Sequence, residues 1–240
     1  MSVDTGIPAD RRVAAELRAE IERLVQIAAR KPGLALREGR PGCAWSFNWD
    51  QDVVTVNPVD LRTLAPDLCR GVALHEASHA AITVLHRFIP EGLIRALMPL
   101  LNAVEDLRID VWQRRRFPGS APWLDAHNAA IRATAREREL PRSRQVQFLL
   151  GMLERGYFGE TAPGTLPEVL SALDACRAPI ARAVACQPPP GDDPAGVLAS
   201  QRGMWQMVRE RILPVWRSLV ELDRREGIGD LARQELESFL

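Results

Sequence analysis

Long hydrophobic runs and an excess of charge of either sign are both missing from this 240-residue sequence. The longest apolar runs, around residues 80–85 and 97–101, fall far short of the roughly 20 residues that a membrane-spanning helix needs. Lys plus Arg and Asp plus Glu number 31 each, so no net charge attracts the chain to nucleic acid or to an anionic membrane. Arginine clusters such as residues 114–116 have acidic neighbours and are typical of solvated helix faces. We therefore expect neither nucleic acid nor a membrane as a partner.

Closely spaced cysteine pairs are also missing. The four cysteines show no C-x-x-C spacing, and charged side chains interrupt residues 1–30, so no secretory signal peptide is recognisable. Without such a signal, free thiols in a reducing compartment are expected. Hydrophobic residues at 46% and charged residues at 26% are typical of a folded globular protein. These features predict a cytoplasmic location.

Helical periodicity dominates what is present. Apolar residues recur at every third or fourth position over residues 10–31. Similar patterns predict further helices over residues 65–88, 100–116, 122–139, 142–156, 166–186 and 195–226. Pro90 and Pro99 predict a break before the helix at 100–116.

A small sheet is the other expected component. Residues 45–49 and 53–57 alternate aromatic or valine side chains with small or polar ones, which predicts a β-hairpin. The expected fold is α+β and mainly α, with a small antiparallel sheet. Residues 1–120 would form the core, and residues 121–240 a helical region packed on it. The proline-rich residues 187–194 are the best candidate for a linker.

The most informative motif is H-E-x-x-H, formed by His75, Glu76 and His79 inside a predicted helix. On a helix, side chains four residues apart share one face with Cβ atoms about 5–6 Å apart, so both imidazoles can converge on one ion. The intervening glutamate then lies beside the open coordination position and can take a proton from a metal-bound water. With 4 histidines in 240 residues, chance produces this template in roughly 0.5% of sequences. The motif predicts a Zn²⁺ site with His75 and His79 as ligands and Glu76 as the catalytic base.

A catalytic zinc site also needs a third protein ligand. A third histidine six residues after the second is absent, because Leu85 holds that position. His86 shares the predicted helix face but lies about 10.5 Å further along the axis than His79, too far to share the ion. Residues 101–110, L-N-A-V-E-D-L-R-I-D, are the next source because they begin a helix after the proline break.

Within that segment Asn102, Glu105 and Asp106 share one face of the predicted helix. One carboxylate can bind metal while its neighbours accept the N–H of a ligand imidazole. The alternative to a metal-binding role is that these residues form an acidic helix surface exposed to solvent.

These residues resemble the zincin superfamily, and more closely its glutamate-ligand branch, the gluzincins. The resemblance implies a zincin-like active-site helix with His75 and His79 as ligands, Glu76 as general base and Glu105 as third ligand. H-E-A-S-H with N-A-V-E-D-L-R-I-D is also similar to zincin-like regions of CobT-type and von Willebrand-domain-associated proteins. The resemblance covers roughly residues 45–112.

The chain departs from that pattern after the third ligand. Thermolysin-like enzymes place an aspartate four residues after the glutamate, but Ile109 stands there. The acidic pair with this spacing is Asp106 and Asp110, which leaves open that Asp106 is the ligand and Asp110 its support. Arg108 is a further candidate to orient an acidic neighbour or to stabilise charge.

The implied function is a zinc metallopeptidase that cleaves a peptide or protein substrate through a metal-activated water. Tyr157 and His127 are candidates to stabilise the developing oxyanion, although each also fits a structural role. One strand of the hairpin could pair with an extended substrate. In the alternative interpretation, the tryptophans of the hairpin only cap the core.

Two other functions remain open at this stage. The first is a catalytically silent binding or regulatory module that partners a MoxR-type ATPase or von Willebrand-domain system, as the CobT-like resemblance suggests. The second is a purely structural zinc site, which would need a fourth protein ligand. The apolar stripe of Leu213, Trp216, Leu219 and Val220 in the C-terminal helices fits either core packing or a partner surface.

Overall fold

The computed structural model describes residues 9–191 and 193–239, and helices make up most of them. The expectation of an α+β, mainly α protein is confirmed. The chain divides into two compact units, one comprising Met1–Ala81 and Gln113–Ala130 and the other Ile82–Trp112 and Ile131–Leu240. Because the chain passes between the units more than once, their limits do not follow the predicted boundary at residue 120. None of the described helices is both long and apolar enough to cross a membrane.

The first unit contains helices and the small sheet. Its elements are α1 (Ala9–Ala29), β1 (Ala35–Glu38), β2 (Ser46–Asn48), β3 (Val53–Val56), α2 (Asp60–Thr63), α3 (Pro66–Ile82) except its last residue, the 3-10 turn η2 (Pro118–Ser120) and the first part of α5 (Ala121–Arg136). α3 is the helix that carries the H-E-x-x-H motif.

The sheet differs from the predicted hairpin in one strand. β2 and β3 pair antiparallel as expected, with Phe47 opposite Val54. β1 was not predicted, and it pairs parallel with β3, so the sheet is mixed and has the order β1-β3-β2. β3 is therefore the central strand and offers no edge to a substrate, which corrects one of the two edges considered above. β1 is short and carries charged side chains at Arg37 and Glu38, so it lacks the alternation of apolar and polar residues that would predict a strand.

The core of this unit explains why α3 lies where it does. Buried side chains from α1, β1, β3 and α3 form one apolar cluster, and Leu124 of α5 joins it. Val54 and Val56 of β3 are fully buried, and so are Ala73 and Ala77 of α3. Trp45 packs against this cluster, and its indole Nε1 donates a hydrogen bond to Asp60 at 2.8 Å. Trp45 therefore has the core-capping role rather than that of a substrate edge.

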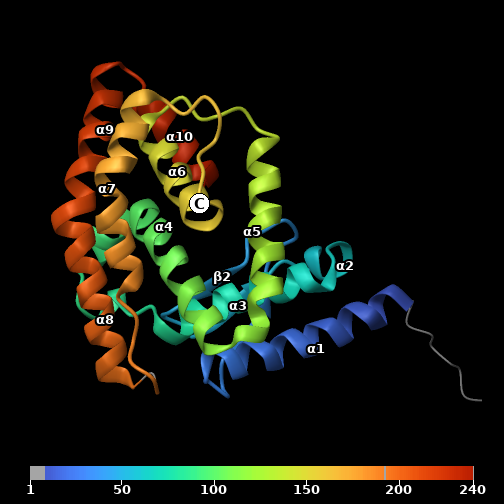
Figure 1. Ribbon diagram of the computed structural model, residues 1–240. Helices are drawn as coiled ribbons and strands as arrows, with labels where there is room; N and C mark the ends of the chain where they lie inside the picture. The colour runs from blue at the N-terminus through green and yellow to red at the C-terminus, as the bar shows by residue number, and fades with distance from the viewer. Residues whose placement is uncertain (1–8, 192, 240) are drawn as a thin grey trace, which may run out of the picture. The chain divides into compact units, whose positions relative to one another are not determined.

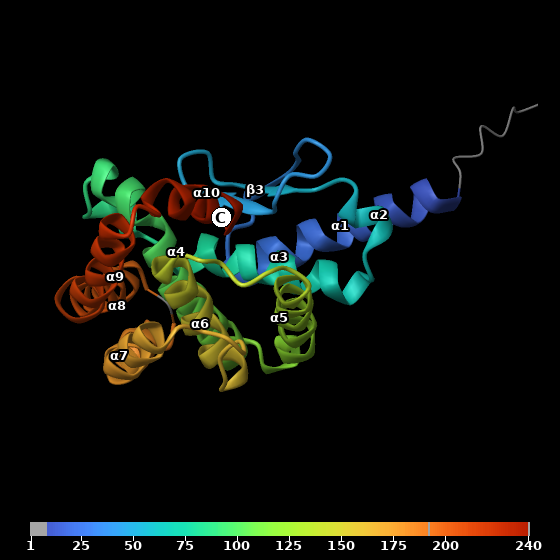
Figure 2. The same cartoon turned by 90° about the horizontal axis from the view of Figure 1, so that it is seen from above.

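The second unit is a helical bundle. Its elements are the 3-10 turn η1 (Leu85–Arg87), α4 (Glu91–Arg116) except its last four residues, α6 (Arg144–Phe158), α7 (Pro167–Ala185), α8 (Pro194–Met207), the π-turn η3 (Val208–Ile212), α9 (Leu213–Arg225) and α10 (Gly229–Phe239), together with the end of α5. α7 contacts α6, α8 and α9. Figure 1 shows α7 beside the rod formed by α8 and α9, and Figure 2 views these helices nearly end-on, so they run roughly parallel.

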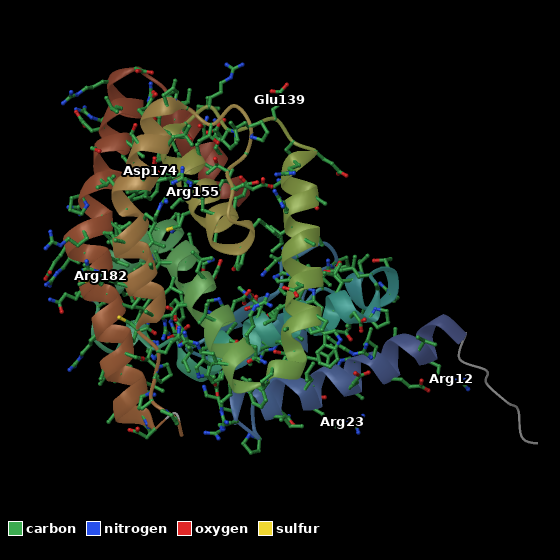
Figure 3. The ribbon with its side chains drawn as sticks, viewed as in Figure 1. Arg12, Arg23, Glu139, Arg155, Asp174 and Arg182 are labelled. Atoms are coloured by element: carbon green, nitrogen blue, oxygen red, sulfur yellow. The ribbon has the colours of Figure 1, made fainter. Side chains whose placement is uncertain are left out.

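Contacts inside the bundle account for the apolar C-terminal stripe. Leu213, Trp216 and Leu219 are buried, and the indole Nε1 of Trp216 donates to the carbonyl of Gln145. On the outside, Arg155 of α6 and Asp174 of α7 form an ion pair at 2.7 Å, and the two side chains lie next to each other in Figure 3. The stripe thus packs within the unit.

The predicted break at Pro99 is wrong, because α4 runs through it. Proline removes one backbone hydrogen bond and crowds the preceding turn, which often ends a helix. Here the residues around it, Leu97, Leu100 and Leu101, are buried. Their packing stabilises the helix enough to offset the lost bond. The predicted linker at residues 187–194 does connect two helices, α7 and α8.

Candidate metal centre

The two motif histidines lie one turn apart on α3. The ring centroids of His75 and His79 are 5.0 Å apart, with the ring planes at 78°. Glu76 is between them in sequence and is only 9% exposed. The core-facing residues of the helix, Ala73 and Ala77, lie on its other side, as the 3.6-residue period requires. The motif is therefore helical, as predicted, and its two imidazoles are close enough to bind one ion.

The N-terminal half of α3 is held by α1 and α5. Arg70 donates two hydrogen bonds to Glu20 of α1, at 2.7 and 3.0 Å. Its guanidinium also lies over the ring of Trp123 in α5, 5.5 Å from the centroid. The hydrogen bond from Arg70 holds the pKa of Glu20 below its usual range. These contacts fix α3 one turn before the first motif histidine.

A third imidazole lies beside the pair. His127 of α5 is 9% exposed, and its ring centroid is 5.3 Å from that of His75. Gly71 makes this approach possible, since a Cβ there would lie 2.2 Å from the carbonyl oxygen of Trp123 and 2.9 Å from the Cβ of His127. Gly71 precedes His75 by one turn, so the residue that lets the helices approach is on the same face as the ligand candidate. Sequence reasoning named His127 but missed Gly71, because an isolated glycine in a helical pattern carries no mark of a helix crossing.

Replacing Gly71 with alanine should therefore displace α5 from α3. The new methyl group meets backbone rather than a flexible side chain, so we expect a loss of about 1–3 kcal/mol in the free energy of unfolding. Urea unfolding followed by circular dichroism measures it. Gly92, whose added Cβ would meet nothing within 4 Å, is the control. Equal stability of Gly71→Ala and the wild type would contradict the close crossing.

Glu105, the predicted third ligand, has other partners in the structure. Its carboxylate accepts hydrogen bonds from Arg108 Nε at 2.8 Å and Nη2 at 2.7 Å, from Thr83 Oγ1 at 2.6 Å and from Gln201 Nε2 at 3.0 Å. A carboxylate offers about four lone-pair sites, and these four bonds use them. The side chain is 1% exposed. The structure thus makes Glu105 a buried partner of Arg108 and argues against its assignment as a metal ligand.

Asp106, the alternative ligand, follows Glu105 along α4 and points about 100° away from it around the helix. Asn102, one turn earlier, donates from Nδ2 to Asp106 Oδ2 at 3.3 Å. Asp110, one turn later, is 2% exposed. Asn102 thus supports Asp106 in the manner expected of a residue that orients a ligand.

Two other candidates, His86 and Tyr157, belong to the second unit. His86 is an exposed residue of η1, because α3 ends at Ile82, so it does not extend the helix face as predicted. Tyr157 lies in α6, with its ring centroid 6.1 Å from that of Phe158.

Two of the four cysteines are buried thiols. All four are free thiols, as expected, and Cys69 and Cys176 are buried. Burial raises the pKa of each of these two thiols to about 11. Since the thiolate is the form that binds metal or attacks a carbonyl, they remain unreactive at neutral pH.

The chain was compared with protein-family models, curated proteins and solved structures. None of them matches it. Its function is therefore inferred from its own residues and their geometry.

Proposed function

We propose that the protein is a zinc-dependent metallopeptidase in which His75, His79 and Asp106 hold the ion and Glu76 acts as the general base. One observation carries the proposal. His75 and His79 lie one turn apart on α3 with their ring centroids 5.0 Å apart, and Asp106 is a carboxylate that could complete a metal-binding group with them. Two imidazoles and one carboxylate are a donor set that suits Zn²⁺ and leaves a position for water.

The choice of Asp106 over Glu105 rests on hydrogen bonding. The oxygens of Glu105 are already saturated by Arg108, Thr83 and Gln201. Binding a metal there would require breaking charge-assisted bonds in a buried setting, which is costly. Asp106 accepts a hydrogen bond from Asn102, which orients its carboxylate.

The chemistry follows from the residues around this group. Zn²⁺, when bound, supplies a Lewis acid that polarises a carbonyl and acidifies a water. Glu76, next to His75 in the chain and mostly buried, would accept the proton of the attacking water and return it to the leaving amine. His127, beside His75, is the better placed of the two candidates for stabilising the developing oxyanion. The substrate is a peptide or protein, and a cytoplasmic location stays a prediction.

Metal affinity tests the proposal directly. We expect the purified chain to bind one Zn²⁺, measured by competition with a chromophoric chelator and by elemental analysis. His79→Gln and Asp106→Asn should each weaken binding by at least about tenfold, because even the loss of a group that only supports a ligand costs that much. His86→Gln and Asp230→Asn, which change exposed side chains, are the matched controls and should bind as the wild type does.

Four results would count against it. A wild-type chain without affinity for Zn²⁺ would overturn the metal site, and unchanged affinity in Asp106→Asn would overturn the third ligand. A zinc-loaded chain that cleaves nothing across broad peptide libraries would favour the silent binding module instead. A metal shell without a coordinated water would favour a structural site.

A further inference from the structure

The buried polar groups around Glu105 form a cluster that the proposed mechanism does not use. We call it the Glu105 clamp, and it consists of Thr83, Glu105, Arg108 and Gln201. Each side chain is at most 7% exposed, and Arg108 and Gln201 are fully buried. Burying a charged pair of this kind carries a large desolvation cost, so stability alone does not explain its presence.

The clamp joins four separate parts of the chain. Arg108 Nη2 donates to the carbonyl of Ile82, the last residue of α3, at 3.0 Å, and Nη1 donates to the carbonyl of Cys186 at 3.2 Å. Gln201 of α8 accepts from the backbone N–H of Val84 at 3.0 Å and donates to Glu105. The clamp therefore holds four segments together. They are the end of the motif helix α3, the middle of α4, the linker that follows α7, and the helix α8.

The position of the Glu105 clamp along α4 determines which of the proposed metal ligands it orients. Glu105 precedes Asp106 directly, and a backbone turn that is held at Glu105 sets the direction in which Asp106 points. The residues held on the other side, Ile82 and Thr83, come one turn after His79. A ligand set from two helices needs its geometry fixed to within about 0.5 Å to bind an ion well.

We infer that the Glu105 clamp is a positioning device for the metal ligands, and that Gln201 of the distant helix α8 tunes metal affinity without touching the ion. This inference rests on the proposed metal site. Gln201 is the informative member because its amide both donates to Glu105 and accepts from Arg108 Nη2, at 3.0 and 3.2 Å. Its removal loosens the clamp while the Glu105–Arg108 pair remains.

The test compares two glutamines of the same unit. Gln201→Met keeps side-chain length but loses the clamp bonds, and Thr83→Val removes one bond to Glu105. Gln147→Met is the matched control, since Gln147 is 4% exposed and makes comparable bonds to Pro141 and Leu166. Each variant is titrated with Zn²⁺ and with Co²⁺, whose visible absorption spectrum reports ligand geometry, and its unfolding is followed in urea.

We expect Gln201→Met and Thr83→Val to keep a helical circular dichroism spectrum, to bind Zn²⁺ on the order of tenfold more weakly and to change the Co²⁺ spectrum. Gln147→Met should lose stability but keep both metal properties. Unchanged affinity and spectrum in Gln201→Met would overturn the inference while leaving the metal site intact, and so would equal weakening in Gln147→Met. Should Gln201→Met fail to fold, Thr83→Val decides the outcome. A wild type that binds neither ion would instead overturn the metal site itself.

Discussion

Changing Glu76 to glutamine should reduce peptide hydrolysis by about 10²- to 10⁴-fold while the chain keeps its bound Zn²⁺. The amide has nearly the shape of the carboxylate, so α3 and its two histidines should remain in place. It cannot accept a proton from water, so the step that activates the nucleophile is lost. Turnover of a peptide library, measured together with zinc content, separates the two effects.

Glu91→Gln provides the control for this change. Glu91 lies in the first turn of α4 and is highly exposed, so the same substitution there should leave both hydrolysis and zinc content unaltered. Wild-type turnover in Glu76→Gln would refute the base assignment. Loss of zinc together with activity would show that Glu76 serves the fold rather than the proton transfer.

Changing Arg108 to methionine should destabilise the protein by about 3–5 kcal/mol, because it leaves the Glu105 carboxylate buried without its counter-charge. The side chains of this pair are 0% and 2% exposed, so solvent can compensate very little. Urea unfolding at neutral pH measures the loss. The double variant with Glu105→Leu should recover part of it, since the unpaired charge is then gone.

The same helix supplies a matched pair for comparison. Arg95 and Glu91 are an i,i+4 pair in α4 with side chains 79% and 81% exposed. Arg95→Met should cost no more than about 0.5 kcal/mol, because water solvates the remaining carboxylate. If Arg108→Met were as mild as Arg95→Met, the buried bonding of Glu105 would be wrong, and Glu105 would return as a candidate ligand.

The helical H-E-x-x-H motif could be predicted from local pattern alone. A helix through His75 and His79 follows from the apolar and small residues around them, and the i,i+4 spacing places both rings on one side. The β2–β3 hairpin and most helices could also be predicted, because the periodicity of apolar residues within each element indicates its type. The strand β1 and the continuous helix through Pro99 were not, because pairing with β3 and packing of buried leucines override the local signal.

The sequence by itself determined that this chain is mainly helical and that it carries two imidazoles and a glutamate in an H-E-x-x-H motif on one helix. The reason for proposing Asp106 rather than Glu105 as the third ligand comes only from the tertiary structure. Glu105 and Asp106 are adjacent and equal in charge, and the sequence did not indicate which of them pairs with Arg108. The distinction comes from Gln201, 96 residues away from Glu105 in the chain, and from Thr83, both of which bond to Glu105. Periodicity encodes which face a side chain is on, but hydrogen-bond partners depend on residues that folding brings together from distant positions.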